Sequence, residues 1–248
     1  MKVCILVGNP VEHDGRVLRQ ANLLAKQGHE VTVVGVINPS DRYPSQEFRQ
    51  SQAWQLQFID RRKIGVGPAA RWFFTALRNH LCVDVLGRAT DLLPVVDRAV
   101  SVVGPELARL AARTRAQIFH ANDLDTLAAA ALAAARTGGS FIYDAHEYYV
   151  GLQENMPAHL RRLFRKVERR YIGQAAAVIT VSRHIAQQLV ADYGIPEPLV
   201  VRNTPETLPD LPARVPPTER RELELLYHGN NIGIGRRGVQ DAIAALAK

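Results

Sequence analysis

Two short polar strings contain the residue types best suited to chemistry, and each follows an apolar run. The string His-Ala-Asn-Asp at 120–123 follows the run 116–119, and Asp-Ala-His-Glu at 144–147 follows 140–143. Such carboxylates and imidazoles could exchange protons, hold a metal ion or hydrogen-bond substrate hydroxyls. If both runs are parallel strands of one sheet, the strings meet at its carboxyl edge, where open α/β folds bind ligands. The sequence therefore predicts an active-site cleft at this edge.

The first string offers three candidate site residues. His120 could act beside a reacting group, while Asn122 and Asp123 could hydrogen-bond a substrate. Asn122 cannot exchange protons near neutral pH, which weakens an acid–base role at that position. Alternatively, His120 is a strand-end histidine satisfied by the backbone, and Asp123 caps the helix that begins at Leu124.

The second string suggests a metal site only at first sight. No H-E-x-x-H motif follows it and no cysteine is near, so we expect no metal. His146 and Glu147 could instead recognise a substrate, since they lie at a predicted strand end. The alternative is that Asp144 braces a loop and Glu147 starts the next segment.

A further cluster lies between the first predicted strand, 3–7, and the helix predicted over 16–27. The N–H groups at the helix start and Arg16 could meet a phosphate, and Gly15 would allow its close approach. The alternative is that Asp14 caps this helix while Gly15 and Arg16 occupy its exposed first turn.

The elements that position these clusters follow one repeating pattern. Short apolar runs alternate with longer amphipathic segments, which is typical of an α/β fold with a parallel sheet and helices on both faces. We expect strands over 3–7, 31–36, 55–59, 117–120, 141–144, 178–181 and 199–201. We expect helices over 16–27, 124–136 and 182–193, the last capped by Ser182, with two or three helical segments within 64–115.

Proline content predicts the domain organisation. Residues 1–203 form a first domain, 204–222 a proline-rich linker, and 223–248 a strand, glycine-rich loop and helix that begin a second domain. In this last unit, Gly229, Arg236 and Arg237 could bind phosphate, since positive charge at a helix start opposes the helix dipole unless an anion is present. Otherwise they are ordinary exposed residues.

Composition restricts the partners. The 248 residues carry a net charge of +7, and 47% are hydrophobic, enough for a sizeable core. An arginine-rich surface favours phosphate-bearing partners, but no nucleic-acid-binding motif accompanies it. No apolar run could span a bilayer, and the two cysteines show no metal-ligand spacing, so we expect a cytoplasmic protein.

A basic amphipathic helix is predicted within 157–172. Its arginines flank an apolar stripe, which could lie on an anionic membrane. The same pattern arises when the stripe packs on the sheet and the arginines are solvated.

The order of these motifs resembles the retaining nucleotide-sugar glycosyltransferases of the GT-B class, family 4. The resemblance rests on five segments spread over the chain: 13–17 with 28–31, 120–124, 143–147, 181–183 with 201–203, and 227–230 with 236–238. It implies two facing Rossmann-like domains, the first binding the acceptor and the second the nucleotide-sugar. The implied reaction transfers the sugar with retained configuration, the leaving phosphate helps to accept the acceptor's proton, and neither metal nor cofactor is required.

The resemblance also implies roles for individual residues. His120 would be the catalytic-side histidine, although the family's His-x-His pattern reads His-Ala-Asn here. Acceptor binding would involve Asp14, Gly15, Arg16, Asn122, Asp123, His146 and Glu147. The donor diphosphate would be bound by Gly229, Arg236 and Arg237.

We therefore expect a glycosyltransferase of polysaccharide biosynthesis that acts on a glycan or lipid-linked acceptor. Whether it also contacts an anionic membrane peripherally stays open. The family's Glu-x7-Glu donor segment belongs beyond residue 248, so the isolated chain is expected to be inactive. Two alternatives stay open: a non-catalytic, truncated relative that binds sugar or phosphate, and a sugar-nucleotide epimerase of the same fold.

Overall fold

The computed structural model describes residues 1–63, 103–151, 158–204, 226 and 239–246. The chain divides into two units, Met1–Thr204 and Pro205–Lys248. The predicted linker, most of the strand predicted at 223–227 and the glycine-rich loop lie outside the described residues. In the second unit, helix α9 (Val239–Leu246) matches the helix expected there.

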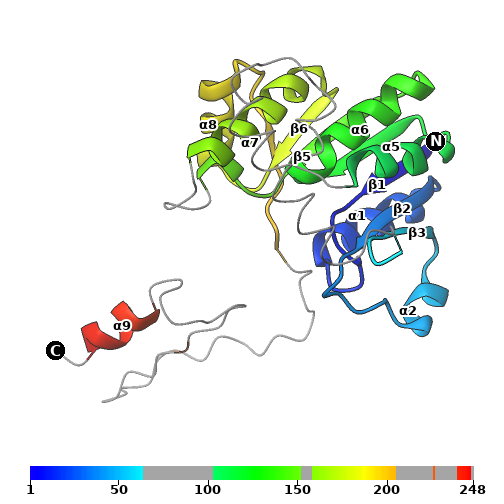
Figure 1. Ribbon diagram of the computed structural model, residues 1–248, viewed down its shortest axis with the longest axis horizontal. Helices are drawn as coiled ribbons and strands as arrows, with labels where there is room; N and C mark the ends of the chain where they lie inside the picture. The colour runs from blue at the N-terminus through cyan, green and yellow to red at the C-terminus, as the bar shows by residue number, and fades with distance from the viewer. Residues whose placement is uncertain (64–102, 152–157, 205–225, 227–238, 247–248) are drawn as a thin grey trace. The chain divides into compact units, whose positions relative to one another are not determined.

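The first unit is built on a seven-stranded sheet, whose order is β3-β2-β1-β4-β5-β6-β7 (Figure 1). Every neighbouring pair of these strands is parallel. The strands are β1 (Lys2–Leu6), β2 (Glu30–Ile37), β3 (Gln55–Asp60), β4 (Ile118–Asn122), β5 (Ser140–Ala145), β6 (Ala177–Thr180) and β7 (Leu199–Val200). The seven strands predicted within residues 1–203 are confirmed, with small shifts at their ends.

The helices between the strands are α1 (Gly15–Lys26), α2 (Gln46–Ser51), α5 (Gly104–Arg113), α6 (Leu124–Thr137), α7 (Ala158–Tyr171) and α8 (Arg183–Tyr193), with 3-10 turns at Tyr149–Gly151 and Ile172–Gln174. The predicted cap is confirmed, because Ser182 Oγ accepts a hydrogen bond from the backbone of Ile185. Gly138 ends α6 with a φ of 71°, a left-handed conformation that glycine adopts without strain. The short helix α2 was not predicted, and 64–102 lies outside the described residues.

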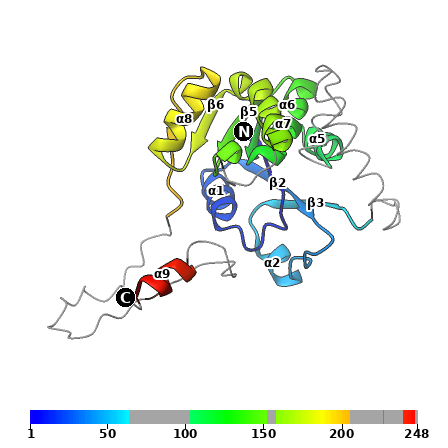
Figure 2. The ribbon, with the colours of Figure 1, turned by 60° about the vertical axis from the view of Figure 1, so that its left-hand side comes forward.

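Helices cover both faces of the sheet (Figures 1 and 2). Alternate residues of a strand point to opposite faces. On β1, Val3 and Ile5 pack with α1 and α2, whereas Cys4 and Leu6 belong to the larger cluster formed with α5, α6 and α7. The predicted doubly covered α/β sheet is therefore confirmed.

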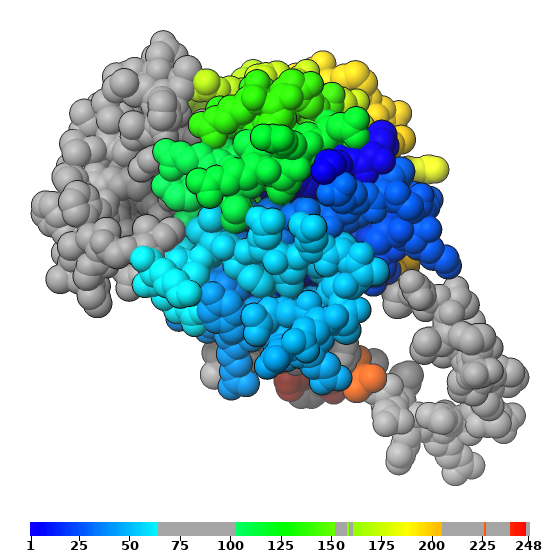
Figure 3. All heavy atoms as spheres, turned by 90° about the vertical axis from the view of Figure 1, so that its right-hand side faces the viewer, coloured from blue at the N-terminus to red at the C-terminus, as the bar shows by residue number. Residues whose placement is uncertain are grey.

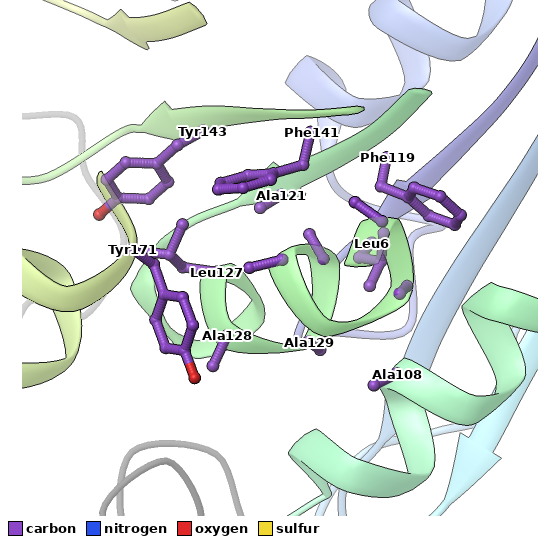
Figure 4. Packing of buried hydrophobic residues seen from close by; sticks show 14 of the residues in the cluster. Leu6, Ala108, Phe119, Ala121, Leu127, Ala128, Ala129, Phe141, Tyr143 and Tyr171 are labelled. Carbon is purple, nitrogen blue, oxygen red and sulfur yellow. The ribbon is translucent and has the colours of Figure 1, made fainter. Parts of the chain in front are cut away.

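The larger cluster packs an alanine-rich helix against aromatic strand residues. Figure 4 shows Phe119, Phe141 and Tyr143 of β4 and β5 above α6. The small side chains of α6, among them Ala129, let the helix approach both the sheet and Ala108 of α5. This packing fixes α6 against β4 and β5. Because α6 begins two residues after β4 ends, its first turn lies at the carboxyl end of that strand.

The apolar stripe of α7 packs inside the protein. Leu163, Val167 and Tyr171 are buried, which agrees with the packing alternative for this basic helix. Glu168 is buried beside them and accepts 2.7 Å hydrogen bonds from the hydroxyls of Tyr143 and Tyr193. The apolar side of α7 is therefore occupied by protein, while Arg162 and Arg169 are exposed.

The strand order reverses next to β1, because β2 and β4 flank it on opposite sides. Ligands of open parallel sheets bind outside the carboxyl ends of strands at such a switch point. In the space-filling view of Figure 3, the cyan residues that include α2 and β3 lie next to the green residues that begin at 103. A ligand-binding site is therefore expected at the carboxyl ends of β1, β4 and β5.

Candidate functional site

A buried ion pair lies at the carboxyl end of β5. Both oxygens of Asp144 accept hydrogen bonds from Arg16, from Nη2 to Oδ1 at 2.7 Å and from Nε to Oδ2 at 2.9 Å. Gln20, one turn further along α1, donates to Oδ2 at 2.6 Å. The side chain of Asp144 is 0% exposed and that of Arg16 is 6% exposed. The network therefore ties α1 to β5 inside the protein.

Arg16 uses its whole guanidinium inside this network. Its remaining terminal nitrogen, Nη1, donates to the carbonyl oxygen of Val201 at 2.7 Å, just after β7. A planar fork of donors suits this double task, which a lysine could not reproduce. The sequence left two alternatives for Arg16, a phosphate contact or a place in the exposed first turn of α1. Arg16 is buried, so the exposed alternative is wrong, and its contacts favour a positioning role.

His146 lies between two carboxylates. Its Nε2 is 3.3 Å from Asp144 Oδ2, and its Nδ1 is 3.2 Å from Asp123 Oδ2. The backbone N–H of His146 also donates to Asp123 Oδ1 at 3.1 Å. The two polar strings therefore meet at one edge of the sheet, as predicted, and His146 connects them.

The charges along this series alternate in sign. Burial lowers the pKa of His146, but the contacts with Asp123 and Asp144 outweigh it and raise the pKa to about 9. Burial raises the pKa of Asp144, but contacts with His120, His146 and Arg16 outweigh it and hold the pKa well below its ordinary value. At neutral pH Asp144 is therefore ionised and His146 is protonated, so each lies beside a side chain of opposite charge type, Arg16 for Asp144 and Asp123 for His146.

Asp123 has a strained backbone. Its φ of 68° and ψ of 168° lie in a region that is almost restricted to glycine. The backbone N–H donates to the carbonyl of Asp144 at 3.0 Å, which helps to hold this conformation. The side chain makes no capping hydrogen bond to α6. The alternative of a simple helix cap is thus not observed, and strain of this kind is concentrated at functional sites.

His120 and Asn122 are more deeply buried than their predicted roles require. His120 is 7% exposed, and its Nε2 lies 3.5 Å from Asp144 Oδ2. Asn122 is 1% exposed and donates from Nδ2 to the carbonyl of Leu6 at 3.2 Å, bridging β4 to β1. His120 Nε2 and Asn122 Oδ1 form no hydrogen bond within the described residues, and the same is true of His146 Nε2, whose contact with Asp144 is an ion pair.

In the loop after β1, Asp14 caps helix α1, as one of the two alternatives predicted. Asp14 Oδ1 accepts from the backbone of Val17 at 3.1 Å, and its other oxygen accepts from Asn9 Nδ2 at 2.8 Å. Gly15 begins α1 and is exposed.

Glu147, after β5, is exposed as well. The predicted donor-side residues, Gly229, Arg236 and Arg237, lie outside the described residues.

Asp125, in the first turn of α6, was not selected from the sequence. Burial, and next the charge of Asp123, raise its pKa to about 7, while His146 acts in the opposite direction. A Cβ added at Gly8 would lie 1.9 Å from Asp125 Oδ2. Gly8 therefore lets the loop after β1 approach this carboxyl group closely.

Sequence reasoning also passed over Asp144 and Gln20 as site residues. One signal was available, because Arg16 and Gln20 are polar residues one helical turn apart, beside the apolar positions Val17 and Ala21. Polar groups next to a buried face need a partner, and the carboxylate at 144 was the acid closest to the predicted sheet edge.

In the described part of the chain, no three or more His, Cys, Asp and Glu side chains are grouped so as to hold a metal ion. None of the helices described is long and apolar enough to cross a bilayer.

Comparisons with known proteins add to this geometry. The model of Glycosyltransferase Family 4 matches residues 16–204. No curated protein matches the chain.

Several solved structures are similar in fold. The lipopolysaccharide outer core galactosyltransferase WaaB, in its apo form, is 12% identical over 90% of this chain and 50% of that chain, with a TM-score of 0.48. A glycosyltransferase from Rickettsia africae is 16% identical over 81% and 43%, with a TM-score of 0.44. Arabidopsis thaliana UGT89C1 complexed with UDP is 10% identical over 82% and 49%, with a TM-score of 0.46. The chain thus spans about half the length of these structures.

Proposed function

The chain belongs to glycosyltransferase family 4, and we propose that its first unit binds the acceptor of an enzyme that transfers a sugar from a nucleotide-sugar with retention. The acceptor we propose is a glycan or a lipid-linked sugar. The observation that carries the proposal is the series of alternating charges from Arg16 to Asp123 at the carboxyl edge of the sheet.

In this proposal Asp123 is the residue that contacts the acceptor. Its side chain is 25% exposed, the most accessible of the series, and a carboxylate accepts hydrogen bonds from sugar hydroxyls. His146 positions Asp123 through contacts with the carboxylate and the backbone. Arg16 in turn positions Asp144 behind His146. The strain at Asp123 supports the proposal, since it aims this carboxylate away from an ordinary capping geometry.

His146 does not serve as the base in this reaction. A histidine whose pKa is raised to about 9 is already protonated at neutral pH and has no lone pair to accept a proton. We therefore assign the acceptor's proton to the leaving phosphate, as the family resemblance implies. His120 remains a proposed catalytic-side residue, and its burial next to Asp144 supports an indirect effect through that carboxylate.

The remaining parts of the proposal concern the donor and the location. We propose that the nucleotide-sugar binds mainly to a complete second domain through Gly229, Arg236 and Arg237, without a metal, and that the 248-residue chain alone transfers little sugar. We also propose a cytoplasmic enzyme, and any contact with anionic membrane would use the arginine-bearing side of α7.

The test is a transfer assay on the natural reading frame and on the 248-residue chain, using a panel of nucleotide-sugars with glycan and lipid-linked acceptors. We expect transfer with retained anomeric configuration by the former and little or none by the latter. Asp123→Asn should lower kcat/KM about tenfold or more, the value of one hydrogen bond to a charged group. Glu30→Gln is the matched control, because Glu30 is exposed and lies at the amino end of β2.

Three results would count against the proposal. Donor conversion without an acceptor product would indicate an epimerase. Saturable donor binding without any turnover in the natural reading frame would indicate a binding protein. An Asp123→Asn variant with the activity of Glu30→Gln would remove Asp123 from the acceptor site.

A further inference from the structure

Arg61, the first residue after β3, lies at the same edge of the sheet as the strand-end network. Its backbone N–H donates to the carbonyl of Ile37 at 3.0 Å, continuing the pairing of β2 and β3. Its guanidinium extends from β3 to the residue after β2, where Nη1 donates to Asn38 Oδ1 at 2.7 Å. Arg61 therefore lies along the carboxyl edge.

Asn38 is held in place so that its oxygen meets Arg61. The side-chain Nδ2 donates to Asp41 Oδ2 at 2.9 Å and to the carbonyl of Gly8 at 3.2 Å. Its backbone N–H donates to the same Asp41 oxygen at 2.8 Å. Asn38 thus orients the guanidinium of Arg61, but as a neutral amide it supplies no negative charge to pair with it.

The neighbouring arginine has a different environment. Arg62 forms two hydrogen bonds with Asp60, from Nε at 2.9 Å and from Nη2 at 3.1 Å, and its guanidinium lies 4.7 Å from the ring centroid of Tyr43. The hydrogen bond from Arg62 lowers the pKa of Asp60 to about 2, so this carboxylate is ionised and already paired. Within the described ranges, Arg61 has no carboxylate within ion-pair distance.

An arginine that is oriented by a neutral amide is well prepared to bind an anion. The guanidinium fork matches phosphate and carboxylate oxygens, and pre-orientation reduces the entropy lost on binding. The loop at Gly8 connects this group to the strand-end network, since Gly8 accepts from Asn38 and also contacts Asp125. The edge thus has a cation at the β3 side and carboxylates at the β4 side.

We propose that Arg61 binds an anionic group of the sugar acceptor, a phosphate or a carboxylate, while Asp123 contacts one of its hydroxyls. The acceptor is then a phosphorylated or acidic saccharide. This inference rests on the proposed function, because it assigns the ligand to the acceptor side of that site. An arginine that is merely solvated would need no fixed amide partner, and Arg62 shows how the same strand end pairs an arginine with an acid.

The first experiment requires no enzymatic activity. The arginine Nε–Hε resonances of the 248-residue chain are followed by NMR during titration with inorganic phosphate and, separately, acetate, with sodium chloride keeping the ionic strength constant. We expect a saturable shift of the Arg61 resonance with at least one anion. The side-chain amide resonance of Asn38, which remains observable when Arg61 is replaced, should shift in parallel, and this shift should be lost in Arg61→Gln. The Arg61 shift should be weakened in Asn38→Ala and unchanged in the matched control Arg62→Gln. A response that does not saturate, or that persists in Arg61→Gln, would overturn the proposal.

The second experiment separates acceptor from donor. In the natural reading frame, Arg61→Gln should lower kcat/KM for anionic acceptors about tenfold or more relative to neutral ones, mainly through KM, with no change in Arg62→Gln. Equal losses for both acceptor classes, or displacement of phosphate from Arg61 by UDP, would overturn the assignment to the acceptor. If no transfer occurs at all, the proposed function fails, but the phosphate and acetate titrations still decide whether Arg61 binds an anion.

Discussion

Arg16 and Asp144 form a two-point ion pair between α1 and β5 in which neither side chain is more than 6% exposed. Removing one charge from such a pair leaves the other buried without compensation, whereas an exposed pair contributes little. This pair also supports the outer residues, because His146 contacts the oxygen of Asp144 that Arg16 and Gln20 hold. Stability and site geometry therefore depend on the same carboxylate.

The first prediction concerns the loss of this carboxylate's charge. Asp144→Asn should reduce the free energy of unfolding by about 3–5 kcal/mol, since Arg16 would remain as an unpaired buried cation. The measurement is urea-induced unfolding followed by circular dichroism. Glu30→Gln breaks the exposed pair with Lys2 and should cost less than about 1 kcal/mol. Similar losses in the two variants would contradict the buried pairing.

The second prediction tests the close approach of Gly8 to Asp125. Gly8→Ala should destabilise the protein, because the new methyl group would lie 1.9 Å from Asp125 Oδ2. Asp125→Ala removes that oxygen, so the double variant should recover much of the loss. The coupling energy from a double-mutant cycle is expected to be about 0.5–3 kcal/mol and favourable. Strictly additive effects would show that the two residues do not meet.

The third prediction concerns pH and His146. The pKa of His146 in the folded protein is about 9, above the ordinary 6.5, so the folded state binds the proton more tightly. Its contribution to stability is complete below pH 6.5 and is lost as the pH rises through 9. The slope should reach at most about 1.4 kcal/mol per pH unit. His146→Gln should flatten this part of a stability-against-pH curve, and an unchanged slope would assign it to another group.

The fourth prediction uses a separate pH window. The pKa of Asp125 is raised from 3.8 to about 7, so the folded protein again binds the proton more tightly than the unfolded chain. Stability should therefore fall as the pH rises from about 4 to 7. Asp125→Asn should remove this decline while retaining the decline above it that belongs to His146. The check is chemical denaturation across both windows, and a decline that survives Asp125→Asn would refute the assignment.

The sequence predicted more of the fold than of the site, for physical reasons. Periodic apolar runs such as 31–36 specify a buried strand locally, so β2 was found with a small error at its ends. The partners of a polar residue are not local: Arg16 and Asp144 are 128 positions apart. The position of Asp123 at a strand end was predictable, but its positive φ was not, because it depends on contacts with β5 and His146.

The fifth prediction compares glycine with alanine at position 123, where the glycine variant should be the more stable protein. Both replacements remove the contacts with His146, but only glycine adopts the observed φ of 68° and ψ of 168° without strain. Asp123→Gly should therefore be more stable than Asp123→Ala by about 1–3 kcal/mol. Leu23, in the last turn of α1 and 58% exposed, is the control, since there alanine should exceed glycine by up to about 1 kcal/mol. If alanine is the better residue at both positions, the backbone at 123 is not strained, and the support that strain gives to Asp123 as the acceptor contact is lost.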